Sequence, residues 1–486
     1  MKIPRVMSTQ HPDNVHLPFF AGSQDMSGDD EIQEAYYAFS HLGCDEQMWD
    51  CEGKEVDNFV VRKLLTRYEQ FFRQKKLGSD IFLTLRVPNP TVEQEEAKVL
   101  IETLESIPRS YDIIKFFDTQ GIPPIFEVIL PMTTSHKCLN RIYYYYKDFI
   151  TGRQSLPFYP GDITIAEWIG EFKPEKINVI PLFEDREHML EAHNILREYL
   201  RNKDVRGQRV FLARSDPAMN YGMVSAILLN KIALQRLRRL SKEIGVEIYP
   251  ILGVGSAPFR GNLKPSTIDE IIAEYPDVQT FTVQSAFKYD NPVPDVVNAI
   301  KRFYEAPRRE AGVVDEEMCL KIIDKVSTEY SRQIEMLAPL INHIAGFLPR
   351  RRMRKLHVGL FGYSRSVGRV SLPRAIGFCA ACYSIGLPPE ILGLNVLRSD
   401  ELEYVRSVYM NFDLSMEEAL SFFNEEVLDI LPQEIKDSIK VNYCRYKRNE
   451  EHKEVTSRII KALKEGTDRN LQAMIIEAGH IRKFLG

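Results

Sequence analysis

Short apolar runs recur along the chain, separated by segments of helical periodicity, and this alternation limits the fold more than any other feature. The runs that indicate strands are residues 47–52, 80–86, 124–132, 177–184, 208–215, 247–254, 278–284 and 355–361. Helical patterns such as Glu187–Arg201 and Met223–Ile244 lie between most of them. Alternating strands and helices are typical of parallel βαβ units, and eight such units close into a (β/α)8 barrel. The sequence therefore predicts an α/β fold of the TIM-barrel type.

Two long segments add helices to the predicted barrel. Residues 291–354 separate the last two candidate strands, and this interval is too long for one crossover, so we predict a helical insertion. Residues 372–486 are also largely helical in pattern. Because no Gly/Ser-rich linker and no repeat divides the chain, residues 1–486 are predicted to form a single elaborated domain.

Two of the candidate strands end in a carboxylate. Glu184 ends the run INVIPLFE, and Asp216 ends the run QRVFLARSD. In a closed α/β barrel the carboxyl ends of all strands lie at one face, where active sites form. Carboxylate oxygens are the ligands that Mg²⁺ and Mn²⁺ prefer, so we predict a divalent metal site at this pair. The alternative is that both are solvated strand-end residues or helix N-caps.

A glycine-rich turn follows the sixth candidate strand. It reads GVGSAPFRG and contains Gly255, Arg260 and Gly261. Such a turn allows backbone N–H groups to approach a phosphate closely, and an arginine can bind the same group through two hydrogen bonds. An ordinary strand-to-helix turn is the alternative.

Other cationic and polar residues also stand at strand ends. They are Arg86, Gln284, and the arginines Arg365, Arg369 and Arg374 after the last candidate strand. Several arginines at a barrel mouth that also holds a metal would bind a small, multiply anionic substrate. Ion pairing on surface helices is the alternative for any single one.

His11 lies near the N-terminus in the segment STQHPDN. Histidine titrates near neutral pH, so a positioned imidazole can act as a general acid or base. A lone histidine near a terminus is otherwise a surface residue, and the sequence leaves both interpretations open.

The composition narrows the classes of partner. With 486 residues, 44% of them hydrophobic, the chain can bury a large core, and its net charge of −5 gives no reason to expect nucleic acid or a membrane surface. The basic cluster 349–355 is a local exception, for which a solvated face or an ion-pair and anion-binding surface is favoured over a polyanion patch. Seven scattered cysteines and the lack of a signal sequence predict reduced thiols and a cytoplasmic protein. The Cys379-x-x-Cys382 pair is predicted to pack in a buried helix.

Taken in order, these segments resemble those of the phosphoenolpyruvate carboxylase family, and the chain length resembles its short, archaeal-type branch. STQHPD is similar to the segment with the family's catalytic histidine, and PLFE and RSDPAMNYG are similar to the two that supply metal carboxylates. GSAPFRG stands in the place of the glycine–arginine loop. Further similar segments are VQSAFKY, GYSR, LPRAIGF and the glycine-terminated tail AGHIRKFLG. The resemblance runs from residue 8 to the last residue.

The resemblance implies carboxylation of phosphoenolpyruvate by bicarbonate to oxaloacetate and phosphate, an anaplerotic reaction, with Mg²⁺ or Mn²⁺ as cofactor in a homotetramer. The residue roles that it implies are His11 and Arg260 in catalysis, Glu184 and Asp216 at the metal, and Arg86, Gly255, Gly261, Gln284, Arg365 and Arg374 at the substrate or inhibitor. The turn lacks the first arginine and the histidine of the long-form loop, and Met219 stands where a lysine is expected.

Two other functions remain open from the residues. One is a different barrel enzyme that acts on phosphoenolpyruvate or a pyruvate enolate, either a kinase-like phosphotransferase or a lyase. The other is a non-catalytic regulator that binds a metabolite. A kinase requires ADP, a carboxylase requires bicarbonate, and a regulator would be stabilised by its ligand without turnover.

Overall fold

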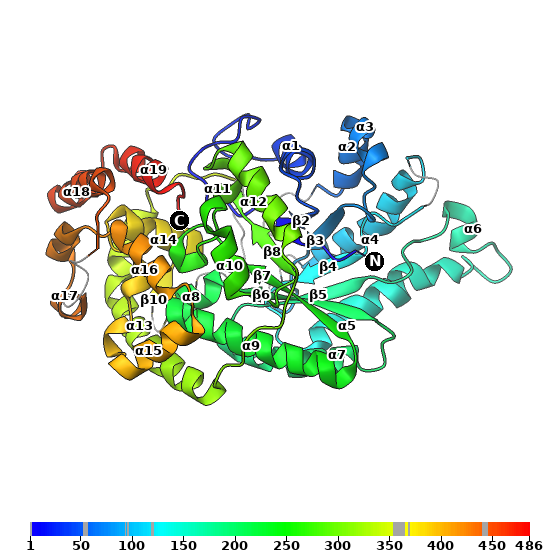
Figure 1. Cartoon of the computed structure of the whole chain (residues 1–486). Coiled ribbons are helices and arrows are strands. Elements are labelled where there is room, and N and C mark those ends of the chain that lie inside the picture. The colour runs from blue at the N-terminus through cyan, green and yellow to red at the C-terminus, as the bar shows by residue number, and fades with distance from the viewer. Residues whose placement is uncertain are drawn as a thin grey trace.

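Eight parallel strands form a closed barrel in which the order of the strands follows the chain, as the sequence predicts (Figure 1). The structure is a computed structural model and describes residues 2–51, 57–92, 94, 97–117, 121–352, 365–367 (backbone only), 370–439 and 446–486. The strands are β1 (Val6–Ser8), β2 (Glu46–Asp50), β3 (Phe82–Arg86), β4 (Glu127–Leu130), β5 (Asn178–Phe183), β6 (Gly207–Ala213), β7 (Glu247–Gly253) and β8 (Thr280–Val283).

The strand that closes the barrel was missed by the sequence analysis. It is β1, which pairs in parallel with both β2 and β8. Three residues are too few to produce a periodic apolar signal, and polar residues follow them directly. The expected strand at 355–361 lies outside the described residues, and the barrel is complete without it. The helices of residues 291–354 therefore follow the barrel and are not inserted into it.

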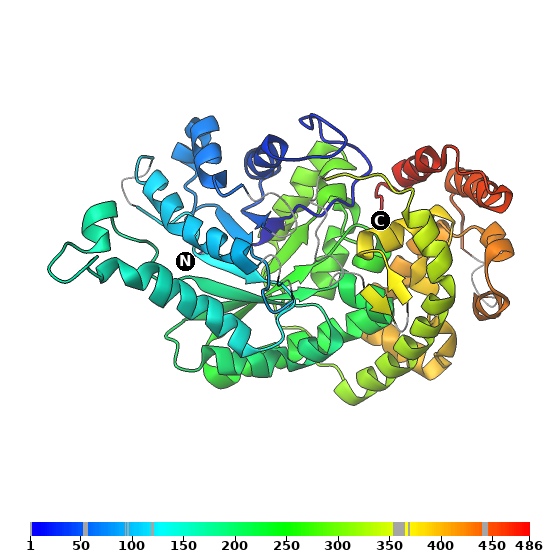
Figure 2. The same ribbon diagram turned by 180° about the vertical axis from the view of Figure 1, so that it is seen from behind.

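Helices cover the outside of the barrel and continue beyond it (Figures 1 and 2). Those that precede or alternate with the strands are α1 (Asp29–Tyr37), α2 (Val60–Arg67), α3 (Glu69–Gln74), α4 (Ala97–Ile114), α5 (His136–Tyr144), α6 (Ile165–Ile169), α7 (Arg186–Leu200), α8 (Ser215–Tyr221), α9 (Met223–Ile244) and α10 (Ile268–Glu274). After β8 come α11 (Ser285–Tyr289), α12 (Val293–Glu305) and α13 (Glu316–Ala345). Both helices that the sequence analysis placed between strands, at 187–201 and 223–244, are confirmed by α7 and α9.

The C-terminal part begins with a hairpin of β9 (Arg365–Val367) and β10 (Val370–Leu372). Helices follow, as expected: α14 (Ala375–Ser384), α15 (Ser399–Val408), α16 (Phe412–Ser421), α17 (Gln433–Ile439), α18 (Glu450–Glu465) and α19 (Leu471–Arg482). These helices lie on one side of the barrel, and α6 projects at the opposite end of the molecule (Figure 1). Cys379 and Cys382 are fully buried in α14, as predicted.

A layer of charged side chains fills the amino end of the barrel interior. Glu46, Glu127, Arg209 and Thr280 come from the even-numbered strands, as in the layers of four that fill such barrels. The guanidinium of Arg209 contacts Glu46 at 2.7 and 2.6 Å and Glu127 at 2.9 Å. The next layers are apolar and include Met48, Ile129 and Phe211. The barrel interior is therefore packed, and only its carboxyl end is available for chemistry.

Within the part of the chain that is described, no single helix is both long and apolar enough to cross a membrane. The helix α14 and the segment Pro389–Val396, bent by 100°, pass that test as a pair by length and composition alone.

Candidate active site

The predicted site residues stand at the carboxyl ends of the barrel strands. His11 lies three residues after β1, Arg86 ends β3, Glu184 directly follows β5, and Asp216 is the second residue of α8, which follows β6. Arg260 ends the short helix η5 (Pro258–Arg260) after β7, and Gln284 directly follows β8. Strand ends of this kind share one face of a barrel, which is where barrel enzymes place their active sites.

Arg260 is the residue through which most of these segments are joined. Its guanidinium is fully buried and donates to the hydroxyl of Ser215 at 3.2 Å, to Asp13 Oδ2 at 3.1 Å and to the side-chain carbonyl of Gln284. A fourth bond of 2.6 Å runs to the carbonyl oxygen of Gly486. Arg260 thus connects the ends of β1, β6 and β8 with the last residue of the chain.

The glycine-rich turn is built to hold this guanidinium. The N–H of Gly255 donates to the carbonyl oxygen of Arg260 at 2.9 Å, so this N–H serves the turn itself. A Cβ on Gly255 would lie 2.8 Å from Cζ of Arg260. Gly261 has φ of 125°, a conformation that favours glycine, and a Cβ there would lie 2.8 Å from Val254. Both glycines are required by the backbone path and by the volume of the arginine.

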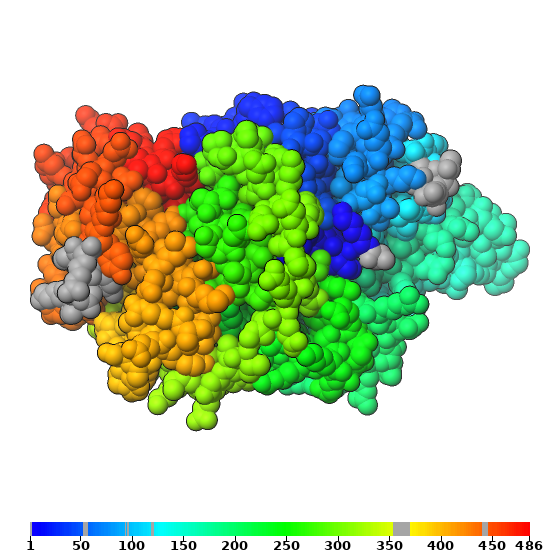
Figure 3. Space-filling model, in the orientation of Figure 1, coloured from blue at the N-terminus to red at the C-terminus, as the bar shows by residue number. Residues whose placement is uncertain are grey.

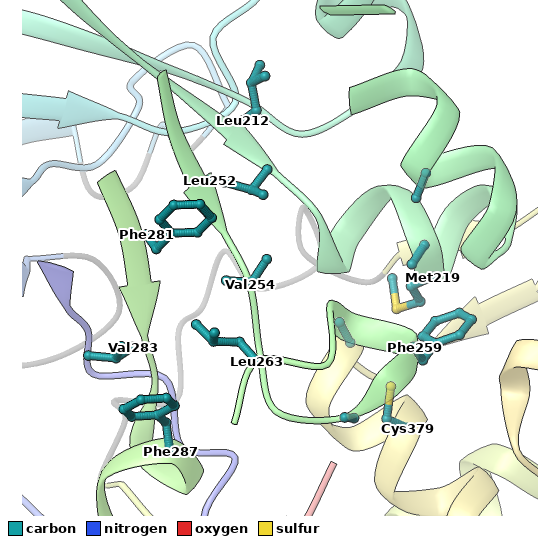
Figure 4. Close-up of a cluster of buried hydrophobic side chains, with 14 of the residues drawn as sticks. Leu212, Met219, Leu252, Val254, Phe259, Leu263, Phe281, Val283, Phe287 and Cys379 are labelled. Carbon is teal, nitrogen blue, oxygen red and sulfur yellow. The ribbon is translucent and has the colours of Figure 1, made fainter. Parts of the chain in front are cut away.

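An apolar cluster anchors the turn from behind (Figure 4). Phe259 lies between Met219 of α8 and Cys379 of α14, and its ring centroid is 5.6 Å from that of Phe378. Met219 is fully buried in this cluster. Its environment is apolar, so α8 offers no cation at this position.

Asp13 is a site residue that the sequence analysis did not single out. Its Oδ1 accepts from the backbone N–H of Ala286 at 2.7 Å, while Oδ2 accepts from Arg260. Burial raises the pKa of this carboxyl, and the charge of Arg260 and the N–H donors oppose that rise. The signal available in the sequence was its position two residues after His11, in the same STQHPD segment.

His11 is held by its backbone and by one side-chain contact. Its carbonyl oxygen accepts from the N–H of Ser285 at 3.2 Å, which ties the segment to the end of β8. Its Nδ1 lies 2.8 Å from the hydroxyl of Thr9. The ring is partly exposed, in contrast to the buried residues around it. This geometry fixes one ring nitrogen of a side chain that is only partly buried.

Arg86 is paired within the site. It forms a two-pronged contact with Asp50 at 3.1 and 2.8 Å, and the backbone N–H of Asp50 donates to the side chain of Gln10 at 3.0 Å. Gln10 is the neighbour of His11, so the ends of β2 and β3 are also joined to the histidine segment. Asp50 lies in the candidate strand 47–52 but, like Asp13, was not singled out as a site residue by the sequence analysis.

Glu184 and Asp216 lie at the ends of two adjacent strands, since β5 pairs with β6. Glu184 Oε2 accepts from the backbone N–H of Met132 at 2.8 Å. Around these two, no group of three or more His, Cys, Asp or Glu side chains converges within the described residues. Two carboxylates fit a Mg²⁺ or Mn²⁺ ion that keeps water and substrate oxygens as its other ligands, which is the usual binding mode of Mg²⁺.

The second cationic group is only partly described. Arg365 belongs to β9, of which the backbone alone is described, Arg369 lies outside the described residues, and Arg374 is exposed at the N-cap of α14. Their predicted roles at the substrate stay predictions.

The described part of the basic cluster at 349–355 is largely buried, and it contains ion pairs, which are one of the forms that the sequence analysis favoured. Arg351 and Arg352 are buried, and Arg352 contacts Glu34 at 2.6 Å and Glu31 at 3.3 Å. Glu34 also binds Lys288, which lies four residues after Gln284, at 2.9 Å. Internal acidic partners therefore neutralise Arg352, whereas Arg351 donates to the carbonyl oxygens of Asn14 and Val15.

Comparisons with known proteins agree over the whole chain. A family model described as phosphoenolpyruvate carboxylase matches residues 3–486. A protein of that name from Methanothermobacter thermautotrophicus is 56% identical over 486 residues, which covers 100% of both chains. A second, from Halobacterium salinarum, is 47% identical over 491 residues and covers 100% of this chain and 99% of its own. A third, from Pyrococcus furiosus, is 52% identical over 429 residues and covers 88% of this chain and 90% of its own.

Proposed function

The chain belongs to the phosphoenolpyruvate carboxylase family, a family of lyases, and we propose that it carboxylates phosphoenolpyruvate with bicarbonate to give oxaloacetate and phosphate. The observation that carries this proposal is the match over residues 3–486 to that family. Such a reaction replenishes a four-carbon acid, so the proposed role is anaplerotic.

In this proposal the cationic side chains at the barrel mouth bind the substrate. Arg260, with Arg86 in support, would hold the phosphoryl oxygens, because a guanidinium binds a phosphate through two parallel hydrogen bonds. Gln284 and Asp13 orient the Arg260 fork from two sides. A divalent cation held by Glu184 and Asp216 would, when bound, stabilise negative charge on the oxygen that becomes the enolate.

The proposed reaction has three chemical steps. An oxygen of bicarbonate attacks phosphorus, and the bond from phosphorus to the enol oxygen breaks, which gives carboxyphosphate and the enolate of pyruvate. His11 then accepts the proton of carboxyphosphate as its C–O bond breaks into CO₂ and phosphate. The methylene carbon of the enolate attacks CO₂ and forms the new carbon–carbon bond.

One assay tests the reaction type. Oxaloacetate is measured by coupled reduction with NADH and malate dehydrogenase, with and without bicarbonate, Mg²⁺ and ADP. We expect oxaloacetate to require bicarbonate and the divalent ion and to be independent of ADP. Formation of pyruvate that depends on ADP would assign the site to a phosphotransferase instead.

The base role has its own test. The variant His11→Asn keeps a polar side chain but cannot take up a proton, so we expect oxaloacetate formation to fall by about 10²-fold or more. The exposed residue His41 provides the matched control, and His41→Asn is expected to retain full activity. Unchanged activity in His11→Asn would remove this residue from the mechanism.

Metal binding can be followed without turnover. The paramagnetic resonance signal of free Mn²⁺ disappears on binding, so titration gives the affinity of the protein for the ion directly. We expect Glu184→Ala and Asp216→Ala each to weaken Mn²⁺ binding, while Asp324→Ala, which removes an exposed carboxylate on α13, leaves it unchanged. Wild-type affinity in both site variants would exclude them as ligands.

We also propose a homotetramer in a reducing, cytoplasmic setting, with phosphoenolpyruvate and bicarbonate as the small-molecule partners. The six described cysteines are all free thiols. The segment around α6 projects from the body of the molecule (Figure 3). It carries several exposed apolar side chains, among them Tyr159, Trp168 and Ile169, which are 64%, 67% and 52% exposed. Such patches mark interfaces. Light scattering should give four chains for the wild type and fewer for the double variant Trp168→Ser, Ile169→Ser.

A further inference from the structure

A cavity of about 500 Å³ lies outside the barrel between α4 and α5. Its apolar wall consists of Leu100 and Leu104 of α4, Leu130 at the end of β4, and Ile142 of α5. All four side chains are buried and form the floor of the cavity, while Thr91 and Arg141 at its rim are exposed, so the cavity is open to solvent on one side. Its size and apolar lining match those of sites that bind small organic molecules, for which about 300–1,000 Å³ is typical.

One of the described residues that line the cavity is charged. It is Arg141, an exposed residue of α5, and none of the other described lining residues carries a charge. Among the residues that the structure describes, Arg141 has no ion pair with an acidic side chain, unlike Arg260, Arg86 and Arg352. A guanidinium beside an apolar cavity is complementary to a molecule with an apolar body and one anionic group.

The wall of this cavity is connected to the candidate metal carboxylate. Asn89, which lines the cavity, donates to the carbonyl oxygens of Pro131 and Met132 at 2.9 and 3.0 Å. The N–H of the same Met132 donates to Glu184 at 2.8 Å. Met132 has φ of 47°, a conformation that non-glycine residues rarely adopt, so its peptide is held in place by these contacts. Two hydrogen-bonded steps therefore separate the cavity from Glu184.

We propose that this cavity binds a small apolar carboxylic acid, with its hydrocarbon body between α4 and α5 and its carboxylate at Arg141, and that the bound acid changes the contact between Met132 and Glu184. The site is distinct from the barrel mouth, because Leu130 faces away from the barrel interior that Ile129 helps to fill. The proposal does not depend on the reaction that the barrel mouth catalyses.

Cys138 provides a reporter inside the cavity. Burial raises the pKa of its thiol, but hydrogen bonds from the hydroxyls of Ser135, Thr91 and Thr134 outweigh this and lower it. Burial raises the pKa of Cys44, Cys319, Cys379 and Cys382 instead. Because the thiolate is the reactive form, iodoacetamide should alkylate Cys138 before these four. A molecule in the cavity should slow that reaction.

The binding experiment uses 4-phenylbutyrate as the probe and its neutral amide as the matched ligand, each titrated into the full chain by calorimetry. We expect the acid to bind and the amide to bind about tenfold more weakly, the effect of one charge-assisted hydrogen bond at a partly exposed site. Arg141→Gln should abolish this preference. Lys137→Gln, which removes a neighbouring exposed cation that does not line the cavity, should preserve it.

A second variant tests the cavity itself. Ala97 lines it from the first turn of α4, so Ala97→Phe should fill part of the volume and weaken binding of both acid and amide. The acid should also protect Cys138 from iodoacetamide, as measured by mass spectrometry of its peptide. Equal affinity for acid and amide, an unchanged preference in Arg141→Gln, or no protection of Cys138 would overturn the assignment of the ligand and its place.

Hydrogen exchange tests the connection to Glu184. Binding of 4-phenylbutyrate should change exchange of the peptide that spans residues 130–134, which contains the Met132 N–H, and should leave the strand β7 unchanged. The same experiment on Arg141→Gln, at an equal concentration of acid, should show a smaller change. Binding and protection of Cys138 without any change at 130–134 would refute the effect on Glu184.

Discussion

The guanidinium of Arg260 donates a hydrogen bond of 2.6 Å to the carbonyl oxygen of Gly486, although the two residues are 226 positions apart. The preceding residue is fixed as well, because the N–H of Leu485 donates to the carbonyl oxygen of Asp13 at 2.7 Å. The last two residues therefore lie against both the catalytic arginine candidate and the segment that carries His11. An anionic substrate that binds Arg260 uses the same donors, so the position of Gly486 bears directly on the site.

The variant Gly486→Ala tests this contact. A Cβ at this position would lie 2.1 Å from the carbonyl oxygen of Ile376 and 2.6 Å from the N–H of Ala380, so the residue must move away from α14. Loss of the bond to Arg260 should lower kcat/KM for oxaloacetate formation by about tenfold, the scale of one charge-assisted hydrogen bond. Gly312→Ala is the matched control, because a Cβ at Gly312 meets nothing within 4 Å. Equal activity of the two variants would show that the tail contact has no part in catalysis.

A second variant tests whether activity depends on the space that Gly255 leaves for the guanidinium of Arg260. Gly255→Ala would place a methyl group 2.8 Å from Cζ of Arg260 and displace the guanidinium while keeping its charge. We expect activity to fall by about 10²- to 10³-fold, as for loss of a group that stabilises charge in the transition state. Steady-state measurement of kcat and KM gives the effect.

Arg260→Lys should resemble Gly255→Ala, because a lysine keeps the charge but loses the planar fork. Arg201→Lys, at an exposed position, serves as the control for the chemical change. If Gly255→Ala retained activity while Arg260→Lys lost it, the turn would tolerate more movement than its packing indicates.

The sequence predicts most of the barrel because seven of its strands are apolar runs long enough to show a pattern. The sequence does not predict β1, because its three residues Val6–Ser8 show no local pattern. They form a strand because they pair with β2 and β8. Strand pairing is a tertiary interaction, and periodicity within a window of residues does not report it. The same limit explains why the run at 355–361, which has a strong local pattern, was assigned to the barrel.

In the candidate site, too, some residues could be predicted from the sequence and others could not. Glu184 was found because it follows an apolar run directly, and Arg260 because it lies in a glycine-rich turn after such a run. Asp13 and Ser215 hold the guanidinium of Arg260, yet neither stands out in sequence, because their roles come from contacts across 247 and 45 positions. The residues that hold a buried charge in place therefore cannot be predicted from the sequence and become visible only in the folded structure.

The charged layer at the amino end of the barrel predicts a stability effect without loss of the active-site geometry. Arg209→Met leaves Glu46 and Glu127 buried without their cation, which should reduce the free energy of unfolding by about 3–5 kcal/mol. Urea unfolding followed by circular dichroism measures the change. The triple variant with Glu46→Gln and Glu127→Gln removes the uncompensated charges and should recover most of the loss. A single variant as stable as the wild type would show that water or structural relaxation compensates the two carboxylates.

A buried carboxyl near the Arg260 turn predicts a pH dependence of stability. Glu390 accepts a hydrogen bond from the hydroxyl of Tyr383, and burial raises its pKa from 4.5 to about 7. Between these two pH values the folded protein keeps a proton that the unfolded chain releases. The contribution of Glu390 to the free energy of unfolding therefore falls as pH rises from 4.5 to 7.

The variant Glu390→Gln removes this titration, because an amide keeps the acceptor for Tyr383 and cannot ionise. Its advantage in unfolding free energy over the wild type should therefore grow between pH 4.5 and pH 7, by on the order of 3 kcal/mol. Urea midpoints at four pH values across this range measure that difference. Glu403→Gln changes an exposed carboxylate and should follow the wild-type curve. A difference between Glu390→Gln and wild type that does not vary with pH would mean that the fold does not raise the pKa of Glu390.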